Sequence, residues 1–208
     1  MRQFLLSIFI STLFFSCHID RKLRIAIQPY GKFNPELIDS IKNSLQTIYK
    51  AKAYVYDPKP LPASAFTTVK TPRYRADILI SLLRQDKPDS IDYILGLTRA
   101  DISTTKRDHT GIVKKPESKY SDWGIFGLGY RPGPSAIVST FRIQSTNHSR
   151  FLERLKKICV HEVGHNLGLS HCTSSNTCVM KDAAESIKTI DFVQSSLCQV
   201  CISRLDHR

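Results

Sequence analysis

The sequence predicts an α+β fold, with a mixed, twisted sheet and one early helix followed by a helical last third. Apolar segments of strand length recur between residues 23 and 141, one amphipathic segment interrupts them, and helical spacing begins near Asn147. Strands followed by helices, rather than a regular alternation of the two, are typical of α+β domains. The chain has 208 residues and is 41% hydrophobic, enough for one core. We therefore expect residues 24–208 to form a single domain.

The first strand and the early helix are predicted near the start of this domain. Leu23 to Gln28 (LRIAIQ) has the composition of a strand, and Pro29 and Gly31 end it. Residues 34–36 (NPE) then supply an N-cap, a proline at the first helical position and an acid in the first turn. Apolar residues with the three-to-four spacing of a helix follow at Leu37, Ile38, Ile41, Leu45 and Ile48.

The remaining strands are predicted in the middle of the chain. Residues 102–122 are polar and lysine-rich, and predict a long surface loop of the kind that often borders a functional site. The segments that we interpret as strands are 53–56, 76–83 (ADILISLL), 92–98 (DYILGLT), 124–130 (GIFGLGY) and 135–141 (SAIVSTF).

A helix that begins near Asn147 leads into the motif H-E-x-x-H at residues 161–165. Residues four apart share one face of a helix, so the imidazoles of His161 and His165 can point at one metal ion. Glu162 lies one step round the helix, where its carboxylate can reach a water on that ion. Gly168 can adopt a left-handed conformation that ends the helix, so that the chain turns back and brings His171 to the ion.

Three neutral histidines leave a fourth coordination position open, the arrangement of a catalytic rather than a structural zinc. The ion would lower the pKa of its bound water to about 7, while Glu162 acts as general base and passes the proton to the leaving amine. The alternatives are histidines that only serve solubility or packing at a helix end, and a zinc protein without activity. The intact Glu162 favours a peptidase that hydrolyses peptide bonds.

The motif His161-Glu162-x-x-His165-x-x-Gly168-x-x-His171 resembles that of the metzincin zinc peptidases, and the cysteines that follow narrow the resemblance. Cys172 follows His171, Cys178 precedes Met180 by two residues, and Cys198 and Cys201 form a C-x-x-C pair. This order resembles the archaemetzincin family, although five residues rather than four separate the first pair. The resemblance implies a metzincin-like fold with an active-site helix, a C-terminal helical segment, and Met180 as the Met-turn residue under the three histidines.

Two readings of the four cysteines (Cys172, Cys178, Cys198 and Cys201) remain open. Two closely spaced pairs suit a tetrahedral structural zinc site that would clamp the C-terminal segment against the catalytic turn. Two disulfides are the competing reading, because exported proteins meet oxidising conditions. The family resemblance favours zinc, so we expect two zinc ions per chain, one catalytic and one structural.

The N-terminus predicts export. Arg2 precedes an apolar run from Phe4 to Phe15 that is too short to span a bilayer but suits a secretory signal. The run ends in Ser16-Cys17, which resembles a bacterial lipoprotein signal, so we expect residues 1–16 to be removed and Cys17 to be lipidated. A plain secretory signal and an uncleaved anchor are the alternatives. The prediction is a monomeric, membrane-anchored lipoprotein of the cell envelope.

Composition says less about partners than the motif does. Thirty Lys and Arg against 18 Asp and Glu give a formal charge of +12, but no basic run or aromatic-interleaved basic motif supports nucleic-acid binding. We expect a peptide or protein substrate, and the resemblance together with the short chain favours small peptides. Removal of N-terminal residues by an aminopeptidase and internal cleavage are both open. The alternative is a non-catalytic, lipid-anchored zinc protein that binds a partner, which Glu162→Ala would distinguish because an enzyme would lose turnover.

Overall fold

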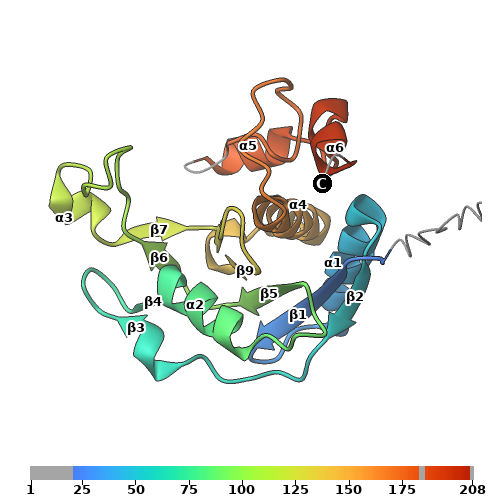
Figure 1. Cartoon of the computed structure of the whole chain (residues 1–208). Helices are drawn as coiled ribbons and strands as arrows, with labels where there is room; N and C mark the ends of the chain where they lie inside the picture. The colour runs from blue at the N-terminus through green and yellow to red at the C-terminus, as the bar shows by residue number, and fades with distance from the viewer. Residues whose placement is uncertain (1–20, 183–185, 207–208) are drawn as a thin grey trace, which may run out of the picture.

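The computed structural model describes residues 21–182 and 186–206, so the lipoprotein-like signal and Cys17 lie outside the described residues. Its elements run from β1 near the N-terminus to α6 near the C-terminus (Figure 1). The strands are β1 (Arg24–Tyr30), β2 (Lys52–Val55), β3 (Phe66–Thr67), β4 (Arg73–Arg75), β5 (Tyr93–Thr98), β6 (Ile102–Thr104), β7 (Trp123–Ile125), β8 (Gly127–Gly129) and β9 (Ser135–Ser139). The helices are α1 (Pro35–Tyr49), α2 (Ala76–Asp86), α3 (Glu117–Tyr120), α4 (His148–Asn166), α5 (Ile187–Phe192) and α6 (Gln199–Asp206).

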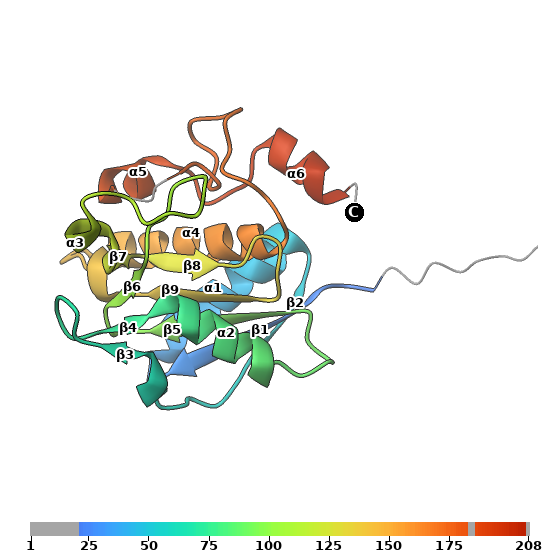
Figure 2. The same cartoon turned by 60° about the vertical axis from the view of Figure 1, so that its left-hand side comes forward.

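The main sheet has five strands in the order β2-β1-β5-β9-β8. The first four are parallel, and β8 pairs antiparallel with β9 at the edge. A parallel sheet needs cover on both faces, and the helices supply it. Alternate residues of β1 separate the two cores: Ile25 and Ile27 pack with α1 and α4, whereas Ala26 packs with α2. The α+β class and the early helix are therefore confirmed. Figure 2 shows α4 lying along the sheet beside β8.

Local sequence explains where the early helix begins and ends. The side chain of Asn34 accepts a hydrogen bond from the Glu36 N–H at 3.0 Å, and Pro35 occupies the first turn. Lys50 ends the helix in the left-handed region, with φ of 49°. The predicted apolar positions Leu37, Ile38, Ile41 and Leu45 are all buried.

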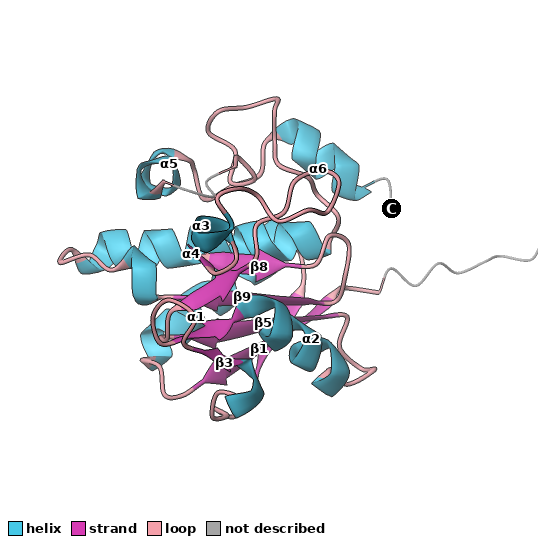
Figure 3. Cartoon of the chain, turned by 90° about the vertical axis from the view of Figure 1, so that its left-hand side faces the viewer, coloured by secondary structure: helices cyan, strands magenta, loops and turns pink. Residues whose placement is uncertain are grey.

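The strand predicted at residues 76–83 is wrong, because this segment forms α2, which covers the second face of the main sheet (Figure 3). Its buried residues, Ala76, Leu79, Ile80 and Leu83, are three or four apart, so one helical face carries the core contacts. The apolar Ile78, which completes the continuous run in the sequence, packs against the same core only in part.

The single strand predicted at residues 124–130 is two strands in two sheets. β7 belongs to a small sheet of order β3-β4-β6-β7, whereas β8 forms the edge of the main sheet. The change of sheet occurs at Phe126, whose carbonyl accepts a hydrogen bond from the Ser139 N–H at 2.9 Å. The predicted loop at 102–122 is likewise bounded by structure, with β6 at its start and α3 near its end.

After α4 the chain forms irregular turns and the short helices α5 and α6, which lie beyond α4 on the side away from the main sheet (Figure 1). Within the described ranges, no helix is long and apolar enough to cross a membrane.

Candidate active site

Helix α4 positions the first two histidines of the motif. Asn147 caps the helix by accepting from the Arg150 N–H, and the helix then runs unbroken to Asn166. His161 and His165 occupy successive turns on one face, with ring centroids 4.6 Å apart. The structure thus places both side chains on one helix face, and their role as metal ligands stays a prediction.

The chain reverses immediately after α4 and brings His171 back to the same point. Gly168 has φ of 75°, a conformation that glycine adopts without steric cost, and the helix ends two residues before it. The His171 ring lies 5.3 Å from that of His161 and 4.9 Å from that of His165. The ligand atoms of all three histidines lie within 4.8 Å of one another, so this three-histidine site can hold a metal ion.

Backbone carbonyls fix which imidazole nitrogen faces the ion. His161 Nδ1 lies 2.8 Å from the Val179 carbonyl oxygen, and His165 Nδ1 lies 2.7 Å from that of Leu169. A carbonyl oxygen only accepts, so each Nδ1 carries the proton and each Nε2 keeps its lone pair. Such outer contacts orient histidine ligands in metal sites. His171 Nδ1 lies 3.5 Å from the Asp182 carboxylate.

Burial keeps the first two histidines neutral. Desolvation, with a smaller contribution from the neighbouring histidine, lowers the pKa of His161 to about 3. Desolvation also lowers the pKa of His165 to about 4, although the Leu169 carbonyl opposes the shift. At neutral pH both rings therefore present lone pairs, and this donor set fits zinc.

Glu162 lies beside the three histidines, under the edge strand β8. Burial raises its pKa to about 8, and a hydrogen bond from the Gly129 N–H opposes that rise. A bound dication would lower this pKa again, because it favours the carboxylate. Glu162 is thus a buried carboxyl group whose only large perturbation is desolvation, which suits a general base near neutral pH.

The close contact between Glu162 and β8 depends on two glycines that the sequence prediction did not single out. A Cβ at Gly127 would lie 2.7 Å from Glu162 Cγ, and a Cβ at Gly129 would lie 2.7 Å from the Glu162 carbonyl oxygen. The alternation of glycine at 127 and 129 within a predicted strand was the available signal, since glycine in a strand often marks a close backbone approach.

Met180 is fully buried and packs against the helix that carries the histidines. Its Sδ would lie 2.4 Å from a Cβ at Gly164, so this turn of α4 has no room for a side chain. Tyr49 of α1 approaches the same turn and donates to the Val160 carbonyl at 2.6 Å. The role of Met180 as a Met-turn residue stays a prediction, but its position next to α4 is as that role requires.

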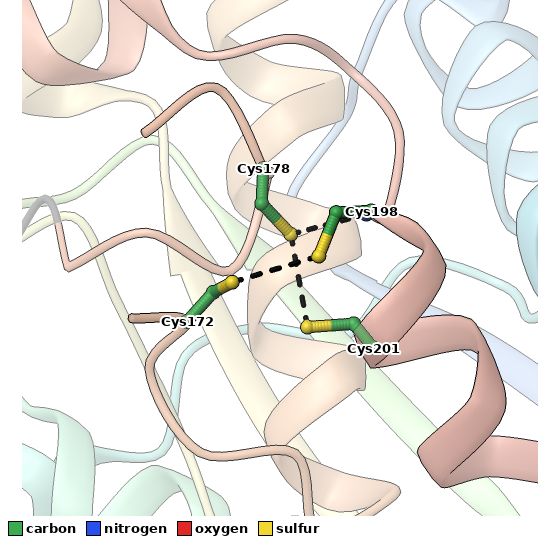
Figure 4. Close-up of side chains that lie close together, drawn as sticks. All are labelled: Cys172, Cys178, Cys198 and Cys201. Atoms are coloured by element: carbon green, nitrogen blue, oxygen red, sulfur yellow. Dashed lines mark hydrogen bonds between the residues drawn. The ribbon is translucent and has the colours of Figure 1, made fainter. Parts of the chain in front are cut away.

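The four predicted cysteines come together in one cluster between the turn after α4 and the start of α6 (Figure 4). Cys172 Sγ lies 3.6 Å from Cys198 Sγ, and Cys178 Sγ lies 3.8 Å from Cys201 Sγ. A zinc ion at about 2.3 Å from each sulfur sets tetrahedral sulfurs about 3.8 Å apart, whereas a disulfide requires about 2.05 Å. The spacing of this four-cysteine site therefore fits a zinc ion rather than two disulfides. Cys159, by contrast, is buried in the core away from this cluster.

The four-cysteine site shares a segment with the catalytic turn. Cys172 follows His171, and its N–H donates to the Met180 carbonyl at 2.8 Å. Val179, whose carbonyl orients His161, lies between Cys178 and Met180. The four-cysteine site is therefore connected to two of the three histidines: Cys172 is adjacent to His171, and Val179, adjacent to Cys178, contacts His161.

A cavity of about 280 Å³ opens over the three-histidine site, between β8 and α4. Its lining includes Gly127 and Gly129 of β8, and His161, Glu162 and His165 of α4. The polar segment 102–122 contributes Thr104 and Lys106 to one end, as expected of a loop that borders the site. Trp123 of β7 and Tyr130, which follows β8, are not among its lining residues in the described part of the chain.

Comparison with known proteins agrees with this geometry. The model of peptidase family M54 matches residues 23–207. The archaemetzincin of Haloarcula marismortui is 27% identical over 188 residues, which cover 86% of this chain and 97% of that protein. The archaemetzincin of Methanopyrus kandleri is 32% identical over 145 residues, covering 70% of this chain and 72% of that protein.

Solved structures give the same result. The crystal structure of the Methanopyrus kandleri archaemetzincin has a TM-score of 0.70 at 26% identity, covering 89% of this chain and 94% of that one. The structure of the Archaeoglobus fulgidus archaemetzincin, complexed with malonate, has a TM-score of 0.68 at 27% identity, covering 88% and 99%. The family match over residues 23–207, the shared fold and the two candidate metal-binding groups agree: the chain belongs to peptidase family M54, the archaemetzincins, and is a zinc metallopeptidase.

Proposed function

We propose that the chain hydrolyses peptide bonds at the three-histidine site, with Glu162 as general base. The observation that carries this proposal is the buried Glu162 carboxyl group beside three convergent histidines on the wall of an open cavity. His161, His165 and His171 would hold the catalytic zinc through Nε2 of the first two. When bound, zinc would acidify a water molecule and polarise the scissile carbonyl.

The chain's own residues then move the proton. Glu162 accepts it from the attacking water and returns it to the leaving amine, which requires the carboxylate to be ionised at the start of each cycle. The Gly129 N–H holds the carboxylate by a hydrogen bond and favours this ionised form. The apolar cover of α4 and β8 limits water around the carboxylate, which strengthens these interactions.

The exposed edge of β8 supports a binding mode for an extended peptide. The Tyr130 N–H donates to the Ser135 carbonyl and the Ser139 N–H donates to the Phe126 carbonyl, so the even-numbered residues direct their N–H and C=O groups toward β9. In an antiparallel ladder the residues between them direct their N–H and C=O groups the other way, so Gly127 and Gly129 face the cavity. A peptide that adds a strand at this edge would pair with Gly127.

We propose a second zinc ion at the four-cysteine site, with a structural role. Its spacing of sulfurs and its burial support this assignment. Two zincs per chain and four free thiols beyond Cys17 and Cys159 after metal removal are the expected result of elemental analysis and thiol titration. One zinc and two disulfides would contradict this assignment and leave the peptidase proposal intact.

Aminopeptidase activity is the finer proposal, and the short chain supports small peptides as its substrates. The test compares peptides with free and acetylated N-termini, using the zinc-loaded enzyme and sequencing the products by mass spectrometry. Removal of single N-terminal residues from free peptides alone is expected. Glu162→Ala should keep both zincs and lose turnover by about 10²-fold or more. A Glu162→Ala variant with unchanged turnover would refute the assignment of the base.

Export and lipid attachment at Cys17 are also proposed, on the sequence of residues 1–17 alone. The family match begins after this segment, at residue 23. Cys17→Ser should move the protein from the membrane fraction to the soluble fraction, and an unchanged distribution would contradict lipidation.

A further inference from the structure

The part of the cavity beside Lys157 is a pocket whose lining includes the apolar side chains of Ile158 of α4, Ile190 of α5 and Val193. Lys157 of α4 lines the same pocket, one helical turn before His161. Lys106, Arg131 and Asp182 also line the cavity, but Lys157 is the charged residue beside these apolar side chains, since it precedes Ile158 in α4 and its Nζ bonds to the Ile190 carbonyl. A few placed polar groups in apolar surroundings set specificity in small binding sites.

The ammonium group of Lys157 is held in place by main-chain oxygens. Its Nζ donates to the Ile190 carbonyl at 3.1 Å and to the Asp191 carbonyl at 3.4 Å. An ammonium group has three hydrogens, so these two bonds leave one for a ligand. Burial lowers the pKa of Lys157, because the charged ammonium group has lost contact with water. An anionic ligand would compensate for this loss.

The carboxylates nearest Lys157 are engaged by other cations. Asp191 forms a two-bond ion pair with Arg154, with distances of 2.6 and 2.7 Å. Glu153 contacts Lys156 and accepts from Ser195 at 2.9 Å. Glu153 and Asp191 still attract the Lys157 charge electrostatically, but each makes its direct ion pair with another cation.

The direction of β8 tells which part of a peptide would reach this pocket. Gly127 lies against the Glu162 side chain, whereas Gly129 lies against the Glu162 carbonyl and Asn166, so β8 runs toward the C-terminal end of α4. A peptide paired antiparallel with β8 runs the opposite way, toward Lys157. Antiparallel pairing is the more stable arrangement per residue. The residues after the scissile bond would therefore enter the pocket.

We propose that this pocket selects a carboxylate on the C-terminal side of the scissile bond, with Lys157 as the specificity-determining residue. The inference rests on the peptidase function proposed above. The carboxylate comes either from an Asp or Glu side chain or from the C-terminus of a short peptide. The aliphatic walls contact the methylene groups that carry it.

A structural role is the competing explanation for Lys157. Ile190 and Asp191 lie in the last turn of α5, where a cation stabilises the exposed carbonyls of a helix end. The experiment must therefore measure selectivity as well as stability. Lys156 supplies a matched control, because it is the adjacent lysine of α4 but pairs with Glu153 and does not line the cavity.

The experiment uses zinc-loaded wild-type chain, Lys157→Met, Lys157→Arg and Lys156→Met. The substrates are octapeptides with free N-termini and amidated C-termini, which carry Glu or Gln at one position each. A second set has free C-terminal carboxylates and no acidic side chain, which separates the two carboxylate sources. Cleavage is followed by mass spectrometry, and the same peptides are titrated calorimetrically into Glu162→Gln, alone and combined with Lys157→Met, to measure binding without turnover.

The wild-type chain should prefer Glu over Gln, or an acid over an amide C-terminus, by about 10-fold in kcat/KM, the scale of one charge-assisted hydrogen bond. Lys157→Met should abolish the preference, whereas Lys157→Arg and Lys156→Met should retain it. Equal use of paired peptides by the wild-type chain, or a preference that survives Lys157→Met, would overturn the inference and leave the peptidase function standing. Lysine-dependent binding of acidic peptides without any cleavage by the wild-type chain would support the inference and overturn the proposed peptidase function.

Discussion

At the residue scale, the position of Glu162 depends on the absence of side chains at Gly127 and Gly129. Both glycines bring the backbone of β8 so close to α4 that the carboxylate sits between the strand and the histidines. The atoms that they approach differ, however: Gly127 meets the flexible Glu162 side chain, and Gly129 meets the rigid main chain of α4. A methyl group at position 127 would therefore act first on the base, and one at position 129 first on the packing of the strand, although the N–H at position 129 also bonds to the carboxylate.

We expect Gly127→Ala to lower kcat by about 10-fold or more, because the new methyl group must displace the general base. Its effect on the free energy of unfolding should be small, because the Glu162 side chain can move away from the new methyl group. Gly129→Ala should instead destabilise the fold by about 1–3 kcal/mol, since the helix backbone cannot move without repacking. Steady-state kinetics and urea denaturation of both variants test this, and equal effects on stability would contradict it.

At the element scale, α2 shows where sequence reasoning failed. Segment 76–83 is a nearly continuous apolar run, a pattern that predicts a strand. Arg75, which precedes the helix, provides no side-chain cap that marks a helix start. Tertiary packing decides its conformation. The second face of the main sheet must be covered, and the apolar face of α2 packs against it. By contrast, α1 could be predicted because Asn34 and Pro35 encode its start locally.

The chain between α4 and α6 has little regular structure, and we infer that the four-cysteine site holds it. Cys201→Ser should remove one zinc equivalent and also lower peptidase activity, although Cys201 does not line the catalytic cavity. The physical reason is that Cys172 and Cys178 flank the segment that carries His171 and the Val179 carbonyl.

Cys159→Ser is the control for this prediction, because Cys159 is a buried thiol of α4 outside the cluster. It should retain both zincs, as measured by elemental analysis. A Cys201→Ser protein that keeps two zincs and full activity would show that the four cysteines do not act as one metal site.

At the scale of the whole molecule, the sequence could predict which residues meet at the site but not what surrounds them. The spacing of His161, His165 and Gly168 follows from helix geometry, so their convergence is local. The two walls of the cavity are not local. Lys157 meets α5 only because the C-terminal segment folds back over α4, and Gly127 meets Glu162 only because β8 joins the main sheet.

Arg154 of α4 joins the segment that precedes this helix to α5. Its guanidinium, buried on α4, donates to the carbonyls of Ile143 and Gln144 and to both carboxylate oxygens of Asp191 on α5. The hydrogen bonds from Arg154 lower the pKa of Asp191. A carboxyl group whose pKa is lowered by folding stabilises the folded state above its unfolded pKa, and this stabilisation disappears as the pH falls through the folded pKa.

Asp191→Asn should therefore be less stable than the wild-type chain at pH 7, and the difference should begin to shrink as the pH falls below about 4, the ordinary pKa of an Asp side chain. We expect a difference of about 1 kcal/mol at pH 7, because the Asp191 side chain is 36% exposed and water screens the pair. Urea unfolding from pH 7 to pH 3 measures it, with Asp39→Asn on the exposed face of α1 as control. Protonation of the histidines at low pH would release metal from all three proteins, so only the difference between them is informative. A difference that stays constant down to pH 3 would mean that Asp191 acts through packing, and that its ion pair with Arg154 does not fasten α5 to α4.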